Sequence, residues 1–209
     1  MHWADVAAKA LSHKGEKHVV STGITPSGEF HIGHLREILT GDMIARAARN
    51  AGLDVEFVFI VDTADPLRKV YDFLGPEYEQ FIGHQLGSIP APDSDGNPDW
   101  DRFNKEGWTY GDHFLKPFLE ALEQIGVRPR IIDNLESYQS GRFDALAKIA
   151  CDRAEDIREA IERISSRELP ENWFPWSPLD SKGSLDGVTV TDYEYPLVHW
   201  KDMHGETGS

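Results

Sequence analysis

Two histidines three residues apart are the side chains best suited to chemistry in this sequence. His31 and His34 follow a turn-rich segment, residues 23–28, and open a stretch with helical periodicity. With this spacing the two imidazoles share one face of the first helical turn, where they can donate hydrogen bonds to phosphate oxygens. The free N–H groups and the positive dipole end of a helix start favour the same anions. The segment therefore predicts a nucleotide-phosphate site, in which Gly33 would let an adenine ring lie against the backbone.

The elements that must position these histidines alternate between helix and strand. Apolar residues recur with helical spacing or in short β-branched runs, separated by glycine, proline and polar turns. The sequence predicts helix, strand, helix, strand, helix and strand over residues 4–11, 18–22, 35–51, 55–61, 114–125 and 130–133. Apolar strands that directly follow helices are typical of a parallel sheet covered by helices. We therefore expect an α/β fold with a Rossmann-like parallel sheet.

Three further segments are interpreted from their composition and period. Residues 83–108 are rich in glycine and proline and predict a long connection. One amphipathic stripe from about residue 141 to 166 predicts a single long helix. Short β patterns at residues 188–191 and 195–200 predict a small β insertion at the C-terminal end of the chain.

Charge and composition limit the classes of function. The 209 residues include 21 basic and 36 acidic ones, a net charge of −15, yet residues 1–50 sum to +1 because they hold six basic and five acidic residues. The remainder, at −16, disfavours nonspecific nucleic-acid binding. The single cysteine, Cys151, excludes an intrachain disulfide and disfavours a thiolate zinc site. The longest apolar run is five residues, against roughly 20 for a membrane span, so we expect a soluble cytoplasmic chain without membrane contact.

The residues around the histidines resemble one family closely. His31-Ile32-Gly33-His34 spells the nucleotide signature of the class I aminoacyl-tRNA synthetases, and residues 21–37 as a whole are similar to the class I lysyl-tRNA synthetases. Segments at residues 2–5, 68–70 and 169–173 are similar to that family in the same order. The resemblance therefore covers about residues 1–178.

The resemblance implies a two-step reaction. ATP activates lysine to lysyl-adenylate with release of pyrophosphate, and the lysyl group then passes to tRNA(Lys). His31 and His34 would be catalytic, as phosphate ligands in the transition state and not as proton shuttles. The ATP site would comprise Pro26, Ser27, Gly28, His31, Gly33 and His34. Mg²⁺ would screen the phosphates, and neither a metal held by the protein nor a protein partner is expected.

The resemblance also implies a lysine site, lined by Gly23 and Thr25. Asp62 is added to it by position, because it closes the second strand at the edge where ligands of open α/β sheets bind. Asp62 and the nearby Asp65 can orient a lysine ammonium group or a hydrated magnesium ion. The alternative interpretation of these two carboxylates is capping of their own loop.

One signature of the family has no counterpart here. The class I enzymes carry a second loop, of Lys-Met-Ser-Lys-Ser type, for pyrophosphate, and residues 181–184 are only superficially similar to it. We therefore interpret residues 1–169 as the first half of a Rossmann-like catalytic domain with the ATP signature, and residues 170–209 as the start of an insertion or a truncated tail. Such an amino-terminal piece would lack the main tRNA docking surface and would have weak or no full activity alone.

Two alternatives stay open. The chain can be a stand-alone paralogue that binds ATP or an aminoacyl-adenylate without charging tRNA. It can also be a class I synthetase or adenylyltransferase of other specificity, such as glutamate, because the histidine motif is shared and only the surrounding loop indicates lysine.

Overall fold

The computed structural model describes residues 2–209 and divides them into two compact units. The first, the sheet unit, comprises residues up to Asp65 together with Leu86–Ser94 and Pro98–Leu135. The second, the hairpin unit, comprises Pro66–Gln85, Asp95–Asn97 and Glu136–Ser209. The domain boundary expected at residue 169 stays a prediction.

A parallel three-stranded sheet forms the centre of the sheet unit. Its strands are β1 (Lys17–Ile24), β2 (Asp54–Val61) and β3 (Arg130–Asp133), in the order β1-β2-β3. The register pairs Thr22 with Phe59 and Val61 with Asp133, so the carboxyl ends of the strands meet at one edge. The predicted α/β fold with a Rossmann-like parallel sheet is confirmed.

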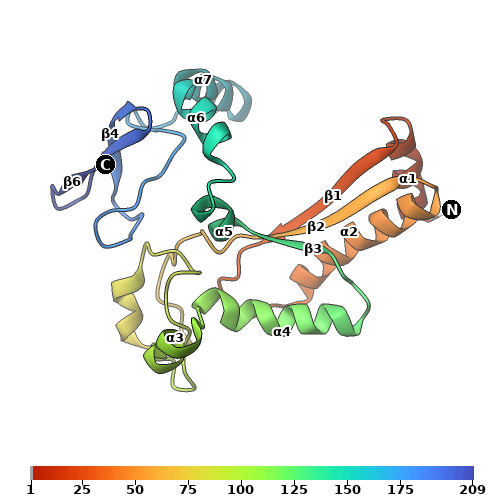
Figure 1. Cartoon of the computed structure of the whole chain (residues 1–209), viewed down its shortest axis with the longest axis horizontal. Coiled ribbons are helices and arrows are strands. Elements are labelled where there is room, and N and C mark those ends of the chain that lie inside the picture. Colours follow the sequence, from red (N-terminus) through yellow and green to blue (C-terminus); the bar gives the residue numbers. More distant parts are fainter. Residues whose placement is uncertain (1) are drawn as a thin grey trace. The chain divides into compact units, whose positions relative to one another are not determined.

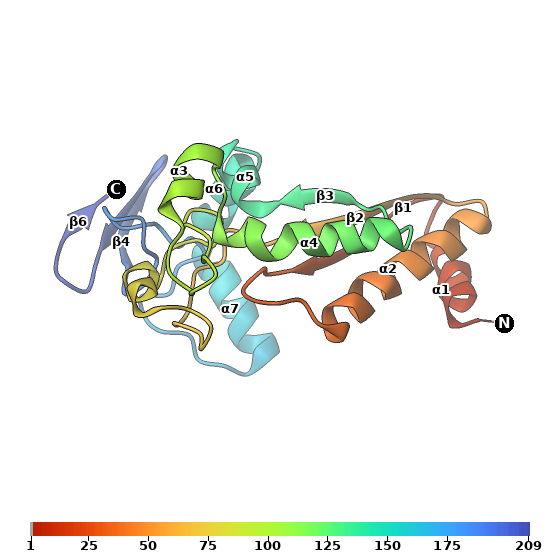
Figure 2. The same cartoon turned by 90° about the horizontal axis from the view of Figure 1, so that it is seen from below.

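Three helices cover one face of this sheet. They are α1 (Trp3–Ser12), α2 (Ile32–Asn50) and α4 (Tyr110–Gln124); α2 and α4 run along the same side of the strands in Figures 1 and 2, and α1 packs against α2. Their apolar stripes meet the β2 side chains in one core, which buries Ile38, Phe57, Phe59 and Leu122 almost completely. Hydrophobic burial of this kind is the main force that holds a helix against a sheet.

Glycines follow the ends of α2 and α4, as predicted from the sequence. Ala51 caps α2 and Gly52 follows with φ 87°, while Gly126 follows α4 with φ 78°. Both values lie in the left-handed region that glycine adopts at low cost. These two stops turn the chain directly into β2 and towards β3.

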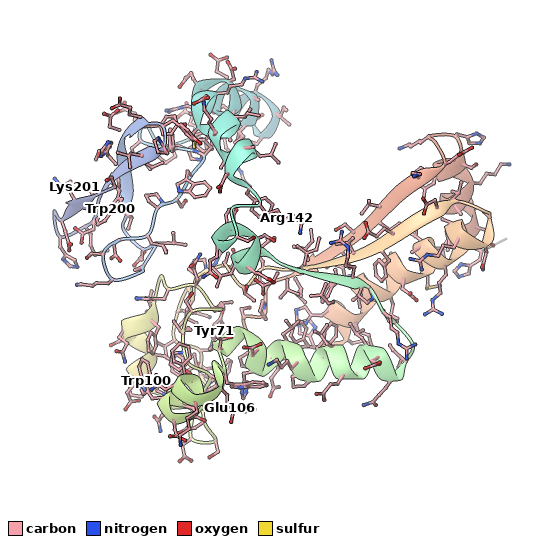
Figure 3. The ribbon with its side chains drawn as sticks, in the orientation of Figure 1. Tyr71, Trp100, Glu106, Arg142, Trp200 and Lys201 are labelled. Carbon is pink, nitrogen blue, oxygen red and sulfur yellow. The ribbon has the colours of Figure 1, made fainter. Side chains whose placement is uncertain are left out.

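The connection expected over residues 83–108 contains a helix that the sequence did not predict. This helix, α3 (Trp100–Glu106), begins at Asp99, whose side chain accepts a hydrogen bond from the Arg102 N–H at 2.9 Å. Figure 3 marks its two end residues, Trp100 and Glu106. A seven-residue helix spans two turns, too few for a period to emerge from the sequence.

In the hairpin unit, the single long helix expected from residue 141 to 166 is wrong. Two helices occupy the segment, α6 (Asp144–Asp152) and α7 (Ala154–Ser165), and the chain bends between them at Arg153, with φ −116° and ψ 30°. The apolar spacing continues across this polar residue, so the pattern alone does not reveal the bend. The short helix α5 (Asn134–Gln139) precedes them, and a 3₁₀ turn, η1 (Pro76–Phe81), lies in the first segment of the unit.

The small β insertion is present as an antiparallel sheet. Its strands are β4 (Thr189–Glu194), β5 (Leu197–Lys201) and β6 (Thr207–Gly208), in that order. Trp200 on β5, labelled in Figure 3, is only 7% exposed and provides the apolar centre of this sheet. Within residues 2–209, no helix has both the length and the apolar character needed to cross a membrane.

The close packing of α2 on the sheet generates a stability prediction at Gly41. A Cβ atom there would lie 2.6 Å from Thr22 Cγ2 and 2.8 Å from Phe57 Cε2. Glycine to alanine in a helix normally stabilises by about 1 kcal/mol, but overpacking costs about 1–3 kcal/mol. We therefore expect Gly41→Ala to lower the free energy of unfolding, measured by urea denaturation.

The neighbouring exposed position supplies the control. Thr40→Ala introduces the same residue at an exposed position of α2 and should leave the free energy of unfolding unchanged or slightly higher. A Gly41→Ala protein as stable as the wild type would show that α2 does not pack on the sheet as described.

Candidate functional site

The two histidines close a reciprocal cap at the start of α2. His31 is the N-cap residue, with φ −128° and ψ 177°, and its Nδ1 accepts a hydrogen bond from the Gly33 N–H at 3.0 Å. His34 reaches back, and its Nδ1 accepts from the His31 N–H at 3.0 Å. Two of the free N–H groups that every helix start leaves are thus satisfied by imidazoles.

This cap determines which ring nitrogen carries the proton. A nitrogen that accepts a hydrogen bond has its lone pair engaged, so in each neutral ring the proton lies on Nε2. Burial lowers the pKa of His34, the neighbouring His31 lowers it further, and Glu37 opposes both effects. The His34 ring is therefore held in its neutral form, with an N–H donor on the side away from the helix backbone.

Gly33 permits the cap. A Cβ atom on Gly33 would lie 2.8 Å from Cε1 and 2.9 Å from Nδ1 of the His31 ring. Any other residue would push the ring off the helix start. The glycine therefore has a structural role beside the adenine contact expected from the sequence.

Two hydrogen bonds hold the loop that leads from β1 to this cap. The Thr25 hydroxyl donates to Asp65 Oδ2 at 2.6 Å. The Tyr110 hydroxyl, at the start of α4, donates to the carbonyl oxygen of Ser27 at 2.8 Å. Pro26, between these two anchors, is fully buried. The predicted ATP residues Pro26, Ser27 and Gly28 thus lie in a loop fixed at both ends.

An aromatic stack continues this support up to the histidines. Phe30 stacks on Phe118 of α4, with ring centroids 4.3 Å apart and planes 8° apart. The His34 ring meets Phe30 edge to face, with ring centroids 5.2 Å apart, and the ring centroids of His31 and His34 are 3.8 Å apart. Pairs of this kind add about 0.5–1.5 kcal/mol beyond the area that they bury. The orientation of the rings is therefore set by α4 as well as by α2.

A cavity of about 500 Å³ opens at the carboxyl end of β1. It is lined by Ser21, Thr22, Gly23, Ile24, Thr25, Glu37, Ile60 and Asp62. All three residues predicted for lysine therefore line one cavity. The carboxylate of Glu37 accepts a hydrogen bond from the Gly23 N–H at 3.4 Å.

The cavity is electrostatically suited to a cation. Burial raises the pKa of Asp62, the nearby carboxylates Asp65 and Asp133 raise it further, and a hydrogen bond from the Asn134 side chain lowers it. Asp65 and Asp133 raise the pKa of Asp62 because their negative charges repel the charged form of its carboxylate. A bound cation would reduce that repulsion. Glu37 adds a further negative charge, from α2.

Sequence reasoning missed Glu37 and Tyr110 as parts of the site. Glu37 follows His34 by three residues and so lies one helical turn further along the same helix, a spacing that could have indicated it. Tyr110 is 83 residues from Ser27, and no local pattern indicates that contact. Only the fold brings Tyr110 and Ser27 together.

Comparisons with known proteins identify the family of this chain. The family model described as tRNA synthetases class I (K) matches residues 1–209. The lysine–tRNA ligase of Picrophilus torridus is 39% identical over the whole chain, and that of Archaeoglobus fulgidus is 37% identical over the whole chain. The lysine–tRNA ligase of Methanocaldococcus jannaschii is 42% identical over 84% of the chain.

The chain spans 38%, 40% and 31% of the length of these three relatives. Its similarity to them nevertheless extends through both the sheet unit and the hairpin unit. Because the family model covers every residue, the chain belongs to the class I tRNA synthetase family of the lysine (K) type.

Proposed function

We propose that this site activates lysine with ATP, as the first step of a lysine–tRNA ligase reaction. The observation that carries the proposal is one continuous segment: Gly23 and Thr25 line an acidic cavity, and six residues after Thr25 the capped histidines present N–H donors. A cavity for an ammonium group and a site for a phosphate thus adjoin along the chain. The relatives, which are named lysine–tRNA ligases, support the same proposal.

The reaction needs positioning and charge stabilisation from the protein. A carboxylate oxygen of lysine attacks the α-phosphorus of ATP, the bond to the bridging oxygen breaks, and pyrophosphate leaves with the electron pair. The Nε2–H groups of His31 and His34 donate to phosphate oxygens as negative charge grows on them. The lysyl group then passes to the terminal adenosine of tRNA(Lys), with AMP as the leaving group. No covalent bond to the protein is required.

The expected Mg²⁺ would arrive with the phosphates of ATP. Within residues 2–209, no group of three or more His, Cys, Asp or Glu side chains is placed to hold a metal ion. The chain itself therefore contributes its histidines, its loop and its carboxylates to the reaction.

The charge of the cavity favours lysine over the alternative specificity for glutamate. Glu37 and Asp62 both line it, and the pKa of Asp62 is already raised by burial and by neighbouring carboxylates. A third carboxylate, from a glutamate side chain, would add repulsion, whereas an ammonium group would reduce it.

His31→Asn separates the capping role of this residue from its phosphate role. Asparagine is a good N-cap residue, so its oxygen can accept the Gly33 N–H and keep α2 stable. It lacks a donor at the position of Nε2, so we expect ATP affinity to fall about tenfold in calorimetry. His31→Ala, which loses both roles, should also lower the free energy of unfolding by about 1 kcal/mol. Wild-type ATP affinity in His31→Asn would exclude a contact between His31 and the phosphates of bound ATP.

The pKa of His34 provides a second measurement. Burial and His31 lower this pKa in the folded chain, so the folded state binds fewer protons than the unfolded one. The stability from the cap is therefore present above the ordinary histidine value of about 6.5 and is lost as pH falls below it. We expect the His34 ring proton to titrate below 6.5 in NMR spectra. A midpoint above 6.5 would contradict the neutral, capping ring.

Glu37→Gln tests the lysine cavity. The change removes one negative charge and keeps the shape of the side chain, so lysine affinity should fall about threefold to tenfold, allowing for solvent screening at an exposed position. Norleucine, which lacks the side-chain ammonium group of lysine, should bind equally to both proteins in the same calorimetric assay.

Glu29→Gln is the matched control, because Glu29 is an exposed loop carboxylate that does not line the cavity. It should bind lysine as the wild type does. Tighter binding of glutamate than of lysine by the wild-type chain would overturn the specificity proposed here.

A further inference from the structure

The buried phenol of Tyr110 holds one peptide of the nucleotide loop. Tyr110 is 0% exposed, and its hydroxyl donates to the carbonyl oxygen of Ser27 at 2.8 Å. Its ring packs on Phe114 of the same helix, with centroids 5.0 Å apart. A neutral hydrogen bond of this length from a buried phenol fixes the direction of the carbonyl group.

The start of α4 is itself firmly placed, so the phenol is a rigid anchor. Thr109 and Asp112 form a capping box, and the Tyr110 N–H donates to the Ile89 carbonyl at 2.9 Å. The Gly111 N–H donates to the Leu86 carbonyl at 3.0 Å. A Cβ atom on Gly111 would lie 3.1 Å from Thr63 Cγ2, so the helix start lies close against Thr63.

Fixing the Ser27 carbonyl also fixes the next N–H group. The peptide bond between Ser27 and Gly28 is trans. In a planar trans peptide the C=O and N–H bonds point in opposite directions. Because the carbonyl points at the buried Tyr110 hydroxyl, the Gly28 N–H points away from α4.

This orientation matters for an anion. A backbone carbonyl carries the negative end of the peptide dipole and repels phosphate oxygens, whereas a backbone N–H attracts them. While the Tyr110 hydroxyl donates to the Ser27 carbonyl, this carbonyl faces α4 and the Gly28 N–H faces the opposite side. Without the hydroxyl, the peptide can rotate and present the carbonyl instead.

We propose that Tyr110 is a positioning residue that turns the Gly28 N–H towards a phosphate group of ATP. The inference rests on the proposed ATP site and adds to it a specific backbone donor and the side chain that aims it. Tyr110 itself does not touch the nucleotide in this assignment. It acts through the Ser27–Gly28 peptide.

The test compares two adenine nucleotides with the nucleoside adenosine, which has no phosphate. Tyr110→Phe removes only the hydroxyl, so binding of ATP and AMP, measured by calorimetry, should weaken about tenfold. Binding of adenosine should stay unchanged, because adenosine makes no phosphate contact. A purely structural role of Tyr110 would weaken all three ligands together, and that result would overturn the inference.

A second buried phenol provides the matched control. Tyr78 is also 0% exposed, but it lies in η1 of the hairpin unit. Tyr78→Phe should leave the ratio of ATP to adenosine affinity at its wild-type value. The same loss of ATP affinity in Tyr78→Phe would count against a role specific to Tyr110.

A measurement on the wild-type protein keeps the test independent of any variant. In NMR spectra the Gly28 amide proton should shift downfield on addition of ATP and not on addition of adenosine. An unchanged Gly28 amide in a protein that binds ATP would overturn this inference alone. A wild-type chain that binds no ATP would overturn the proposed function, and this inference with it.

Discussion

The reciprocal cap between His31 and His34 is the interaction on which the site depends. It requires α2 to begin at one residue, because a shift by one position would remove either Nδ1 from its backbone partner. The missing side chain at Gly33 is part of that requirement, because a Cβ atom there would meet the His31 ring. In this chain the same contacts that stabilise a helix start also orient two donors towards solvent.

Support for the cap comes from a helix that is distant in the sequence. Through Tyr110 and Phe118, α4 contacts the loop at Ser27 and at Phe30, and Phe30 in turn contacts His34. The loop is thus held between two helices and the end of β1. A loop with so many fixed points loses little further conformational entropy when a ligand binds, which favours affinity.

Local patterns predicted the sheet and its helices, because burial imposes a period on the sequence. The run Val55–Val61 and the stop at Gly52 were sufficient to place β2 after α2, and His31 and His34 marked the helix start. The bend at Arg153 was missed because the apolar spacing does not change there. The contact of Tyr110 with Ser27 was missed for a different reason: it joins residues 83 positions apart, and no local propensity records it.

The cap also affects whether the histidine pair can bind a transition metal. Two imidazoles one helical turn apart are ordinarily a good chelating pair for zinc, nickel or copper, which bind a nitrogen lone pair. Here each Nδ1 lone pair is engaged by a backbone N–H, and each Nε2 carries a proton. A transition metal would have to displace a hydrogen bond or a proton at both rings before it could bind. The reciprocal cap therefore disfavours transition-metal binding at these two rings.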